Sequence, residues 1–380
     1  MLATLPPELS IKVCTYLGLS SAAALGSTCR YFHDISLPLL YRTVVLHKER
    51  QALLFMQTMS QCVDERLTCQ VLSLTITNRL DPPIGPRVLS RDLQTLIPEG
   101  LRRMRRLQHY KGLSFNYGLL NPDVASALFS LTSLTSVQAL LPQSYSTGPV
   151  INLVIPPTLR PNLPNLVSLE LDSYICGATL HSSYIPFFRH LICNHATQLN
   201  RLLLHPPQDD GTPFLEYLPI STSLPSLEAL ALRGPSFSST LARQCPNIRT
   251  LEFTSPVNDT TVIPFDEFPY LESVTASSPE VISQFFRSNG SSRRIRRLQI
   301  GLSYDIVEFV HQDWGCIVPS LVAIDTMDIG LRELCIHAHS VDISLLLDVT
   351  RCLPSLEVLA VYRLYQMNVS ATYSESNGRN

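Results

Sequence analysis

A recurring leucine phrase constrains the fold of this chain more than any other feature of its sequence. The phrase reads apolar, two variable residues, apolar, one variable residue, apolar, and leucine supplies 62 of the 380 residues. A period of 20–50 residues is the signature of repeated supersecondary units, which predicts an array of similar units. The clear copies begin at 166, 199, 227, 248, 271, 295, 331 and 356, with a competing copy at 321 and looser copies at 69, 104 and 134.

Each copy predicts a short β-strand, because alternation places the leucines on one face of a strand and the variable residues on the other. Proline stands two residues before the first apolar position in the copies at 166, 227, 248, 271 and 356. Proline cannot continue a helix and keeps its predecessor extended, so each unit reads helix, proline, strand. The caps Asn121, Ser278 and Asp342 predict helices over 122–128, 279–287 and 343–351. The fold class is therefore α/β.

These units resemble leucine-rich repeats. The resemblance implies an irregular β/α solenoid whose variable strand positions form one surface for a peptide or a folded partner. The family's asparagine, three residues after the third apolar position, is replaced by proline at 142, 207, 235, 256 and 279. Segments 142–162 and 205–223 are expected to be projecting loops. A compact α/β domain with coincidental Leu-x-Leu strands is the alternative.

The N-terminal stretch has a helical pattern instead. Leu9, Val13, Tyr16 and Leu17 recur at helical spacing after two prolines, which predicts a helix with one apolar face. A second short helix is expected over Ala22–Leu25 and a third over 29–35, followed by a turn that begins at Pro38. Because domains near 40 residues seldom bury a sufficient core alone, apolar residues off the main stripe, such as Ile11, suggest a partner surface.

This stretch resembles an F-box. The family pattern Leu-Pro-x-Glu-Leu is present as Leu5, Pro6, Glu8 and Leu9, and Cys29-Arg30-Tyr31-Phe32 and Leu39-Leu40-Tyr41-Arg42 match its later segments. The alanines at 22–24 match the family less well than the acidic residues common there. In the family, this module docks on the Skp adaptor of a Skp–cullin–F-box (SCF) ubiquitin ligase. The resemblance implies that the docking residues are Leu5, Pro6, Pro7, Leu9, Ile11, Val13 and Leu17.

The domain organisation expected from these patterns is an F-box at 1–46, a helical linker at 47–65, a repeat array at 66–365 and a disordered tail at 366–380. Net charge of −2 argues against a globally basic nucleic-acid binder. The ten cysteines lie singly, which favours free thiols and a cytoplasmic or nuclear location. We expect no signal peptide and no membrane span, because no basic region precedes Val13 and no run reaches 18 apolar residues.

The sequence contains no catalytic motif with specific spacing, so we expect no enzyme activity and no cofactor. His181, His190, Cys193 and His195 cluster, but their spacing matches no zinc pattern, and a helical surface is favoured over a metal site. Two arginine runs, 102–106 and 293–297, each straddle the first apolar position of a repeat. There they suit the negative end of a helix dipole better than a specific anion site.

The sequence thus predicts a non-catalytic substrate-recognition adaptor of an SCF ubiquitin ligase. Its F-box would bind the Skp adaptor and, through it, the cullin scaffold, while the repeats hold an unknown protein substrate. The alternatives are a repeat scaffold protein that acts without a ligase and an F-box–Skp pair that works outside one; an enzyme carried on the repeats is less favoured. The residues expected to contact substrate are Glu170, Asp172, Arg233, Glu252, Gln299, His337 and Tyr362.

Overall fold

The computed structural model describes residues 6–77, 91–113, 121–140, 162–172, 185–205, 221–232, 239–253, 268–276, 295–300, 330–338 and 343–363. Several expectations fall outside these ranges: Leu5, Arg233, the helix at 279–287, the copy at 321, nearly all of both projecting loops and the tail at 366–380. The chain divides into two compact units, one of residues 1–248 with 267–269 and one of residues 249–266 with 270–380.

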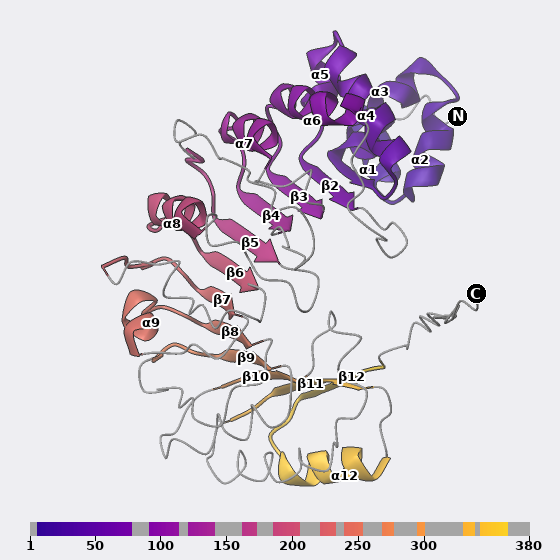
Figure 1. Ribbon diagram of the computed structural model, residues 1–380. Coiled ribbons are helices and arrows are strands. Elements are labelled where there is room, and N and C mark those ends of the chain that lie inside the picture. The colour runs from indigo at the N-terminus through magenta and orange to yellow at the C-terminus, as the bar shows by residue number, and fades with distance from the viewer. Residues whose placement is uncertain are drawn as a thin grey trace, which may run out of the picture. The chain divides into compact units, whose positions relative to one another are not determined.

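Twelve parallel strands form a sheet whose order follows the sequence (Figure 1). The first unit contains α1 (Pro7–Thr15), α2 (Leu19–Gly26), α3 (Arg30–Arg42), β1 (Thr43–Leu46), α4 (Glu49–Gln61), α5 (Glu65–Thr68), β2 (Ser73–Thr77), α6 (Arg91–Arg103), β3 (His109–Leu113), α7 (Pro122–Phe129), β4 (Ser136–Leu140), β5 (Ser168–Asp172), α8 (Ile185–Asn194), β6 (Arg201–His205), β7 (Ala229–Leu232) and α9 (Ser239–Gln244). The second contains β8 (Thr250–Phe253), β9 (Ser273–Ala276), β10 (Arg297–Ile300), β11 (Glu333–Ala338), α12 (Ile343–Cys352) and β12 (Val358–Arg363).

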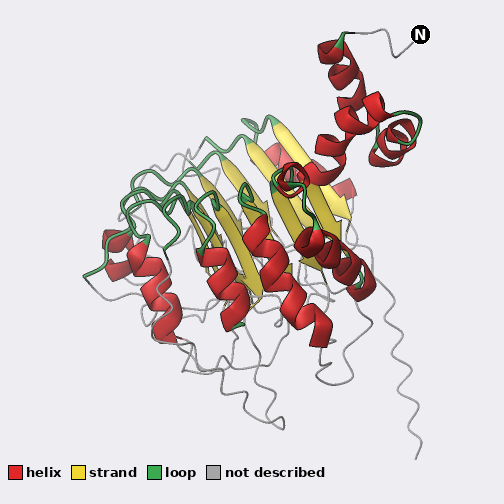
Figure 2. Cartoon of the chain, turned by 90° about the horizontal axis from the view of Figure 1, so that it is seen from above, coloured by secondary structure: helices red, strands yellow, loops and turns green. Residues whose placement is uncertain are grey.

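The leucine phrases coincide with strands in every clear copy that the structure describes. In the first unit Leu169 pairs with Leu202, which pairs with Leu230, so equivalent leucines form continuous buried rows. Figure 2 shows helices along one face of the strands. The predicted return helices at 122–128 and 343–351 are also present, and the Asn121 side chain accepts from the N–H groups of Asp123 and Val124.

Two of the three looser copies, those at 69 and 104, were placed in the wrong register. β2 buries Leu74 and Ile76, and β3 buries Tyr110 and Gly112, so these phrases begin at 71 and 107 rather than at 69 and 104. Tyrosine and glycine replace leucine in β3, which weakens the alternation from which the strand was predicted. The copy at Leu134 is in register, because Val137 and Ala139 are buried in β4.

The N-terminal helices also differ from expectation at one point. α3 continues through Pro38 to Arg42 instead of giving way to a turn, and β1 begins at the next residue. A proline within a helix removes one backbone hydrogen bond but does not always end the helix. The helical module is therefore joined to the sheet without a connecting loop, since β1 pairs in parallel with β2.

The segment predicted as a helical linker, 47–65, contains α4, and α5 begins at its last residue, Glu65. Met56 and Met59 of α4 are completely buried, and α4 packs against α6. The two helices approach closely at Gly100, where an added Cβ would meet the Met56 Sδ at 2.9 Å. This part of the chain thus contributes to the helical layer. The expected boundaries at 46, 65 and 365 remain predictions.

Polar residues placed just before the strands link successive units. Each occupies the position immediately before the first apolar residue of a phrase, and its side chain donates to a backbone carbonyl of the preceding unit, as Asn165 does to the Thr132 oxygen at 2.7 Å. The residues of this pre-strand ladder are Ser133, Asn165, Gln198, Ser226 and Asn247, with donor–acceptor distances of 2.6–2.8 Å. The ladder provides inter-unit hydrogen bonds that the missing asparagine after the strand cannot make.

We predict that replacing Asn165 and Asn247 by alanine lowers the free energy of unfolding by about 0.5–1.5 kcal/mol per site, the usual contribution of a hydrogen bond. The measurement is the urea midpoint followed by circular dichroism. Asn162→Ala is the matched control, because Asn162 is exposed and has no side-chain hydrogen bond within the described residues. Equal midpoints for the control and the ladder variant would show that the ladder contributes nothing.

Candidate partner-binding surfaces

Helix α1 and the start of α2 present apolar side chains to solvent. Leu9, Ile11 and Val13 are 42–50% exposed, Tyr16 is 81% exposed and Leu19 is 63% exposed. We call these five residues the docking patch. Several large apolar residues exposed together on one small module indicate an interaction surface rather than isolated surface hydrophobics.

Small residues explain why the patch faces outward. Ser10 and Cys14 are the buried residues of α1, and the Tyr31 hydroxyl of α3 donates to the Ser10 Oγ at 3.1 Å. In α2 the buried residues are Ala22 and Gly26, and a Cβ added at Gly26 would clash with the Ser36 side chain of α3. Small residues let the helices approach closely, so the larger apolar side chains remain on the outside.

This arrangement bears on two expectations. Leu9, Val13, Tyr16 and Leu17 were predicted to form one apolar face of the helix, with Ile11 and Leu5 off that face, and Leu9, Ile11, Val13 and Leu17 were also among the predicted docking residues. In the structure Leu9, Val13 and Tyr16 are themselves exposed, and Leu17 alone of that stripe is half-buried. Helical periodicity identifies a common face but does not say whether the face turns inward.

Comparison with known protein families identifies the N-terminal helical module. The F-box-like family model matches residues 2–47 of the chain. Residues 2–47 are an F-box-like domain. The match begins and ends within one residue of the boundaries expected from sequence, and it does not extend into the strands that follow. No curated protein was found to match the chain.

The predicted docking residues of the F-box-like domain lie mostly on its surface. Pro6, Pro7, Leu9, Ile11 and Val13 are exposed, Leu17 is half-buried and Leu5 lies outside the described residues. The sequence prediction omitted Tyr16 and Leu19 as partner contacts. The signal that could have identified them is the small pair Ser10 and Cys14 at i, i+4, which occupies the inward side of α1 and leaves the other sides for solvent.

A second candidate surface is the face of the strands opposite the buried leucines. In the first unit the register brings Thr75, Lys111, Gln138 and Glu170 into one row across β2 to β5. All four are half-buried, and the Gln138 amide donates to the Glu170 carboxylate. Of the predicted substrate contacts, Glu170 therefore belongs to this row. Asp172 pairs in register with His205 at the end of the same strands.

The row does not remain open along its whole length. Leu203 pairs with Glu170 across β5 and β6, and Ala231 pairs with Leu203, yet both are buried although they occupy the variable position of the phrase. A single exposed row running along every strand, as the periodicity predicts, is therefore wrong for the first unit. Its accessible polar part is the stretch from Thr75 to Glu170, which we call the polar row.

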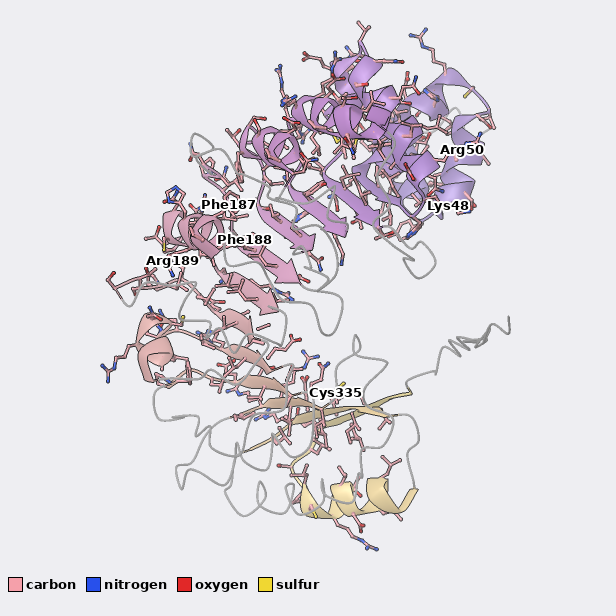
Figure 3. All side chains as sticks on the ribbon, in the orientation of Figure 1. Lys48, Arg50, Phe187, Phe188, Arg189 and Cys335 are labelled. Carbon is pink, nitrogen blue, oxygen red and sulfur yellow. The ribbon has the colours of Figure 1, made fainter. Side chains whose placement is uncertain are left out.

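In the second unit the register aligns Glu252, Thr275, Gln299, Cys335 and Ala360. Glu252 and Gln299, both predicted contacts, thus lie in one row with Thr275 between them. Next to it, His337 pairs with Tyr362, so these two predicted contacts are neighbours on adjacent strands. Burial raises the pKa of the Cys335 thiol, and the nearby Arg297 opposes that shift (Figure 3 shows Cys335 on β11).

The first arginine run lies at the end of a helix, as the dipole explanation requires, whereas Arg293, Arg294 and the residues before them lie outside the described residues. α6 ends at Arg103, whose Nη1 donates to the Cys62 carbonyl at 2.6 Å, and Met104 is buried while Arg102, Arg105 and Arg106 are exposed. In the second run Ile295 is buried, Arg296 and Arg297 are exposed, and Arg297 lies 3.6 Å from the Glu333 carboxylate. In the described part of both runs, one buried apolar residue is followed by two exposed arginines.

Of the histidines near residue 190, His195 has a structural role and His190 lies on the surface. α8 carries Phe187 and Phe188 (Figure 3), both buried, and the Phe187 ring centroid lies 6.3 Å from that of Phe129 on α7. His195 is buried too, its Nε2 accepts from the Leu163 N–H at 3.0 Å, and its Nδ1 donates to the Leu191 carbonyl at 2.7 Å. His190 is exposed and bonds to Asn194 instead. Within the described residues, no group of three His, Cys, Asp or Glu side chains is arranged to hold a metal ion.

Two buried cysteines, Cys245 and Cys335, have thiol pKa values above the ordinary value, and neither is an activated nucleophile. Burial raises the pKa of the Cys245 thiol to about 12, so it is protonated at neutral pH. Cys335 shifts in the same direction. A catalytic cysteine needs a lowered pKa.

Over the described ranges, no helix is both long and apolar enough to cross a membrane.

We predict that His195 makes folding stability depend on pH. Burial lowers the pKa of His195 below its ordinary value near 6.5, so the unfolded chain takes up the proton at a higher pH than the folded one. The stability is fully present above that value, and the free energy of unfolding falls as pH decreases through the folded pKa. The urea midpoint of the parent should drop more between pH 7.5 and 5.5 than that of His195→Gln.

His109→Gln is the matched control for this experiment, since it removes an exposed histidine that does not contribute to the pKa shift of His195. The control should retain the parent's pH dependence. If His195→Gln retained it as well, the assignment of the pH dependence to the buried imidazole would be wrong.

Proposed function

We propose that this protein is a substrate receptor of an SCF-type ubiquitin ligase, with no catalytic step of its own. The F-box-like domain would dock on the Skp adaptor, and the adaptor would connect the chain to a cullin scaffold. The strands would hold a protein substrate. Catalysis would then consist of proximity, since a bound substrate lysine is presented to the ubiquitin thioester at high effective concentration.

The observation that carries this proposal is the docking patch. Five large apolar side chains of the F-box-like domain are exposed, while the buried residues of α1 and α2 are the small Ser10, Cys14, Ala22 and Gly26. Covering such a patch releases about 25 cal/mol for each Å² of apolar surface removed from water. An apolar groove on the adaptor would complement the docking patch.

We predict that Leu9→Asp combined with Val13→Asp abolishes binding of the Skp adaptor, because two carboxylates would have to be desolvated in an apolar interface. The measurement is a pull-down with purified adaptor at equal protein concentrations. Circular dichroism should remain unchanged, because both side chains are solvent-facing.

Leu54→Asp on α4 is the matched control, because Leu54 is 54% exposed but lies beyond residues 2–47. Its adaptor binding should equal that of the parent. Undiminished binding by the double variant would exclude the patch as the adaptor site. In a separate affinity purification of the full chain from cells, recovery of the adaptor without any cullin would favour the F-box–Skp pair that works outside a ligase.

The strands after the F-box-like domain are proposed to be leucine-rich repeats that bind the substrate. In-register leucine rows and parallel order support this, and the prolines before the strands fit a helix-to-strand turn in each unit. The polar row is the favoured contact in the first unit. Its charges alternate, with Lys111 and Glu170 separated by the neutral Gln138, which favours a partner that offers both signs.

We predict that exchanging the two charges of the polar row, Lys111→Glu with Glu170→Arg, lowers partner recovery without changing the net charge. Partners are defined as proteins that copurify with both the parent and the Leu9→Asp, Val13→Asp variant, which excludes the ligase machinery. The matched control exchanges exposed charges on α6, Glu99→Arg with Arg102→Glu. Full recovery by the row variant, with the control also unaffected, would exclude the row as the substrate contact.

A further inference from the structure

Lysine is almost absent from this chain, although arginine is common. The sequence has three lysines, Lys12, Lys48 and Lys111, against 26 arginines, and residues 112–380 contain 15 arginines and no lysine. Lysine is ordinarily among the commonest residues of globular proteins. The chain therefore carries its positive charge almost without primary amines.

The geometry of the guanidinium group explains only some of these arginines. Arg249 lies 3.0 Å from Glu272 and Arg332 lies 3.1 Å from Glu357, where a planar fork suits a carboxylate. Other arginines are exposed, and their side chains form no hydrogen bond or ion pair within the described part of the chain. At such positions a solvated lysine would serve equally well as a surface cation. They include Arg66, Arg102, Arg105, Arg106, Arg201 and Arg243.

Lysine and arginine do differ in their reactivity toward a ubiquitin thioester. A lysine amine that has lost its proton attacks the thioester carbonyl. The new C–N bond forms, the C–S bond breaks, and the thiol of the ubiquitin-carrying enzyme leaves with a proton. The guanidinium group has a pKa above 12 and stays protonated, so it offers no comparable nucleophile.

We propose that arginine in place of lysine protects this receptor from the ubiquitin transfer that it promotes, and that Lys48 is its remaining acceptor site. The inference rests on the proposed function. A substrate receptor is itself held near the thioester, so each exposed lysine on it competes with the substrate at a similar effective concentration. Removing amines from the receptor reserves transfer for the bound partner.

The positions of the three lysines single out Lys48. Lys12 stands on α1 between Ile11 and Val13, within the surface that an adaptor would cover. Lys111 is half-buried in β3, with Thr75 and Gln138 beside it in register. Lys48 is exposed immediately before α4 and lies outside residues 2–47 (Figure 3).

The test uses the full chain assembled with Skp adaptor, cullin, RING subunit, activating and carrying enzymes, ubiquitin and ATP. Four forms are compared: the parent, Lys48→Arg, the triple Arg102→Lys, Arg105→Lys, Arg106→Lys, and the same three positions changed to glutamine. Mass spectrometry locates the ubiquitin remnants on the receptor. Discharge of the ubiquitin thioester onto free lysine verifies that each assembled ligase is active.

Parent conjugates should occur at Lys48 and disappear in Lys48→Arg. The triple lysine variant should be modified roughly fourfold faster, because exposed amines outside α1 rise from one to four. The glutamine variant should behave like the parent, which separates the amine from the loss of arginine.

Two results would overturn the inference while leaving the proposed function intact. An active ligase that modifies the triple lysine variant no faster than the parent would refute protection. Conjugates on Lys12 or Lys111 in place of Lys48 would refute the acceptor assignment. Failure of the chain to assemble with adaptor and cullin would instead refute the proposed function, and protection with it.

Discussion

The pairing of β1 with β2 is the interaction on which the first unit depends. α3 ends at Arg42 and β1 begins at Thr43, so the backbone of the F-box-like domain runs directly into the sheet. The Leu72 N–H donates to the Arg42 carbonyl at 3.0 Å, and the register continues to Leu46 opposite Ile76. The docking patch and the polar row therefore belong to one compact unit. For a receptor that acts through proximity, a direct connection limits the freedom that would otherwise dilute the effective concentration.

The same pairing determines how the domain should be tested. Deletion of residues 1–46 would remove β1 together with nearly all of the F-box-like domain. It would leave β2 as an edge strand with unpaired backbone groups. It would also expose the side chains that Leu46 helps to cover, since Leu46 is buried. Loss of partner binding in such a truncation would not distinguish docking from folding. Point changes at exposed residues keep the sheet intact and separate these two causes.

Much of the strand pattern could be predicted from sequence, because two independent signals coincide there. Alternating leucines specify a half-buried strand, and a preceding proline ends the helix before it. Where one signal was missing, as at β3 with Tyr110 and Gly112, the predicted register was wrong. The pre-strand ladder was missed because an asparagine was sought only after the strand. The hydrogen-bonding role is instead filled before the strand, by Asn165 and by residues of other types such as Ser226.

The candidate surfaces were harder to predict because exposure depends on shape as well as on polarity. In α1, Ser10 and Cys14 are buried although Leu9 and Val13 are more apolar, since close helix packing selects small side chains. On the strands, Leu203 and Ala231 occupy variable positions and are nevertheless buried. The periodicity of two correctly separates the faces of a strand, but what covers each face depends on segments that are distant in sequence. Local pattern alone therefore could not define where the polar row stops.

An exposed docking patch also requires that the F-box-like domain stay folded before its partner binds. Its own core is small: the buried residues of α1, α2 and α3 are Ser10, Cys14, Ala22, Gly26, Phe32 and Ser36, and of these Phe32 alone is large. Domains of this size seldom stand alone without added support. Continuity with β1 supplies that support from the sheet, whose buried leucines are numerous. The domain can thus leave its large apolar residues in solvent and keep their surface available, and a partner that binds only the folded form would stabilise it further by mass action.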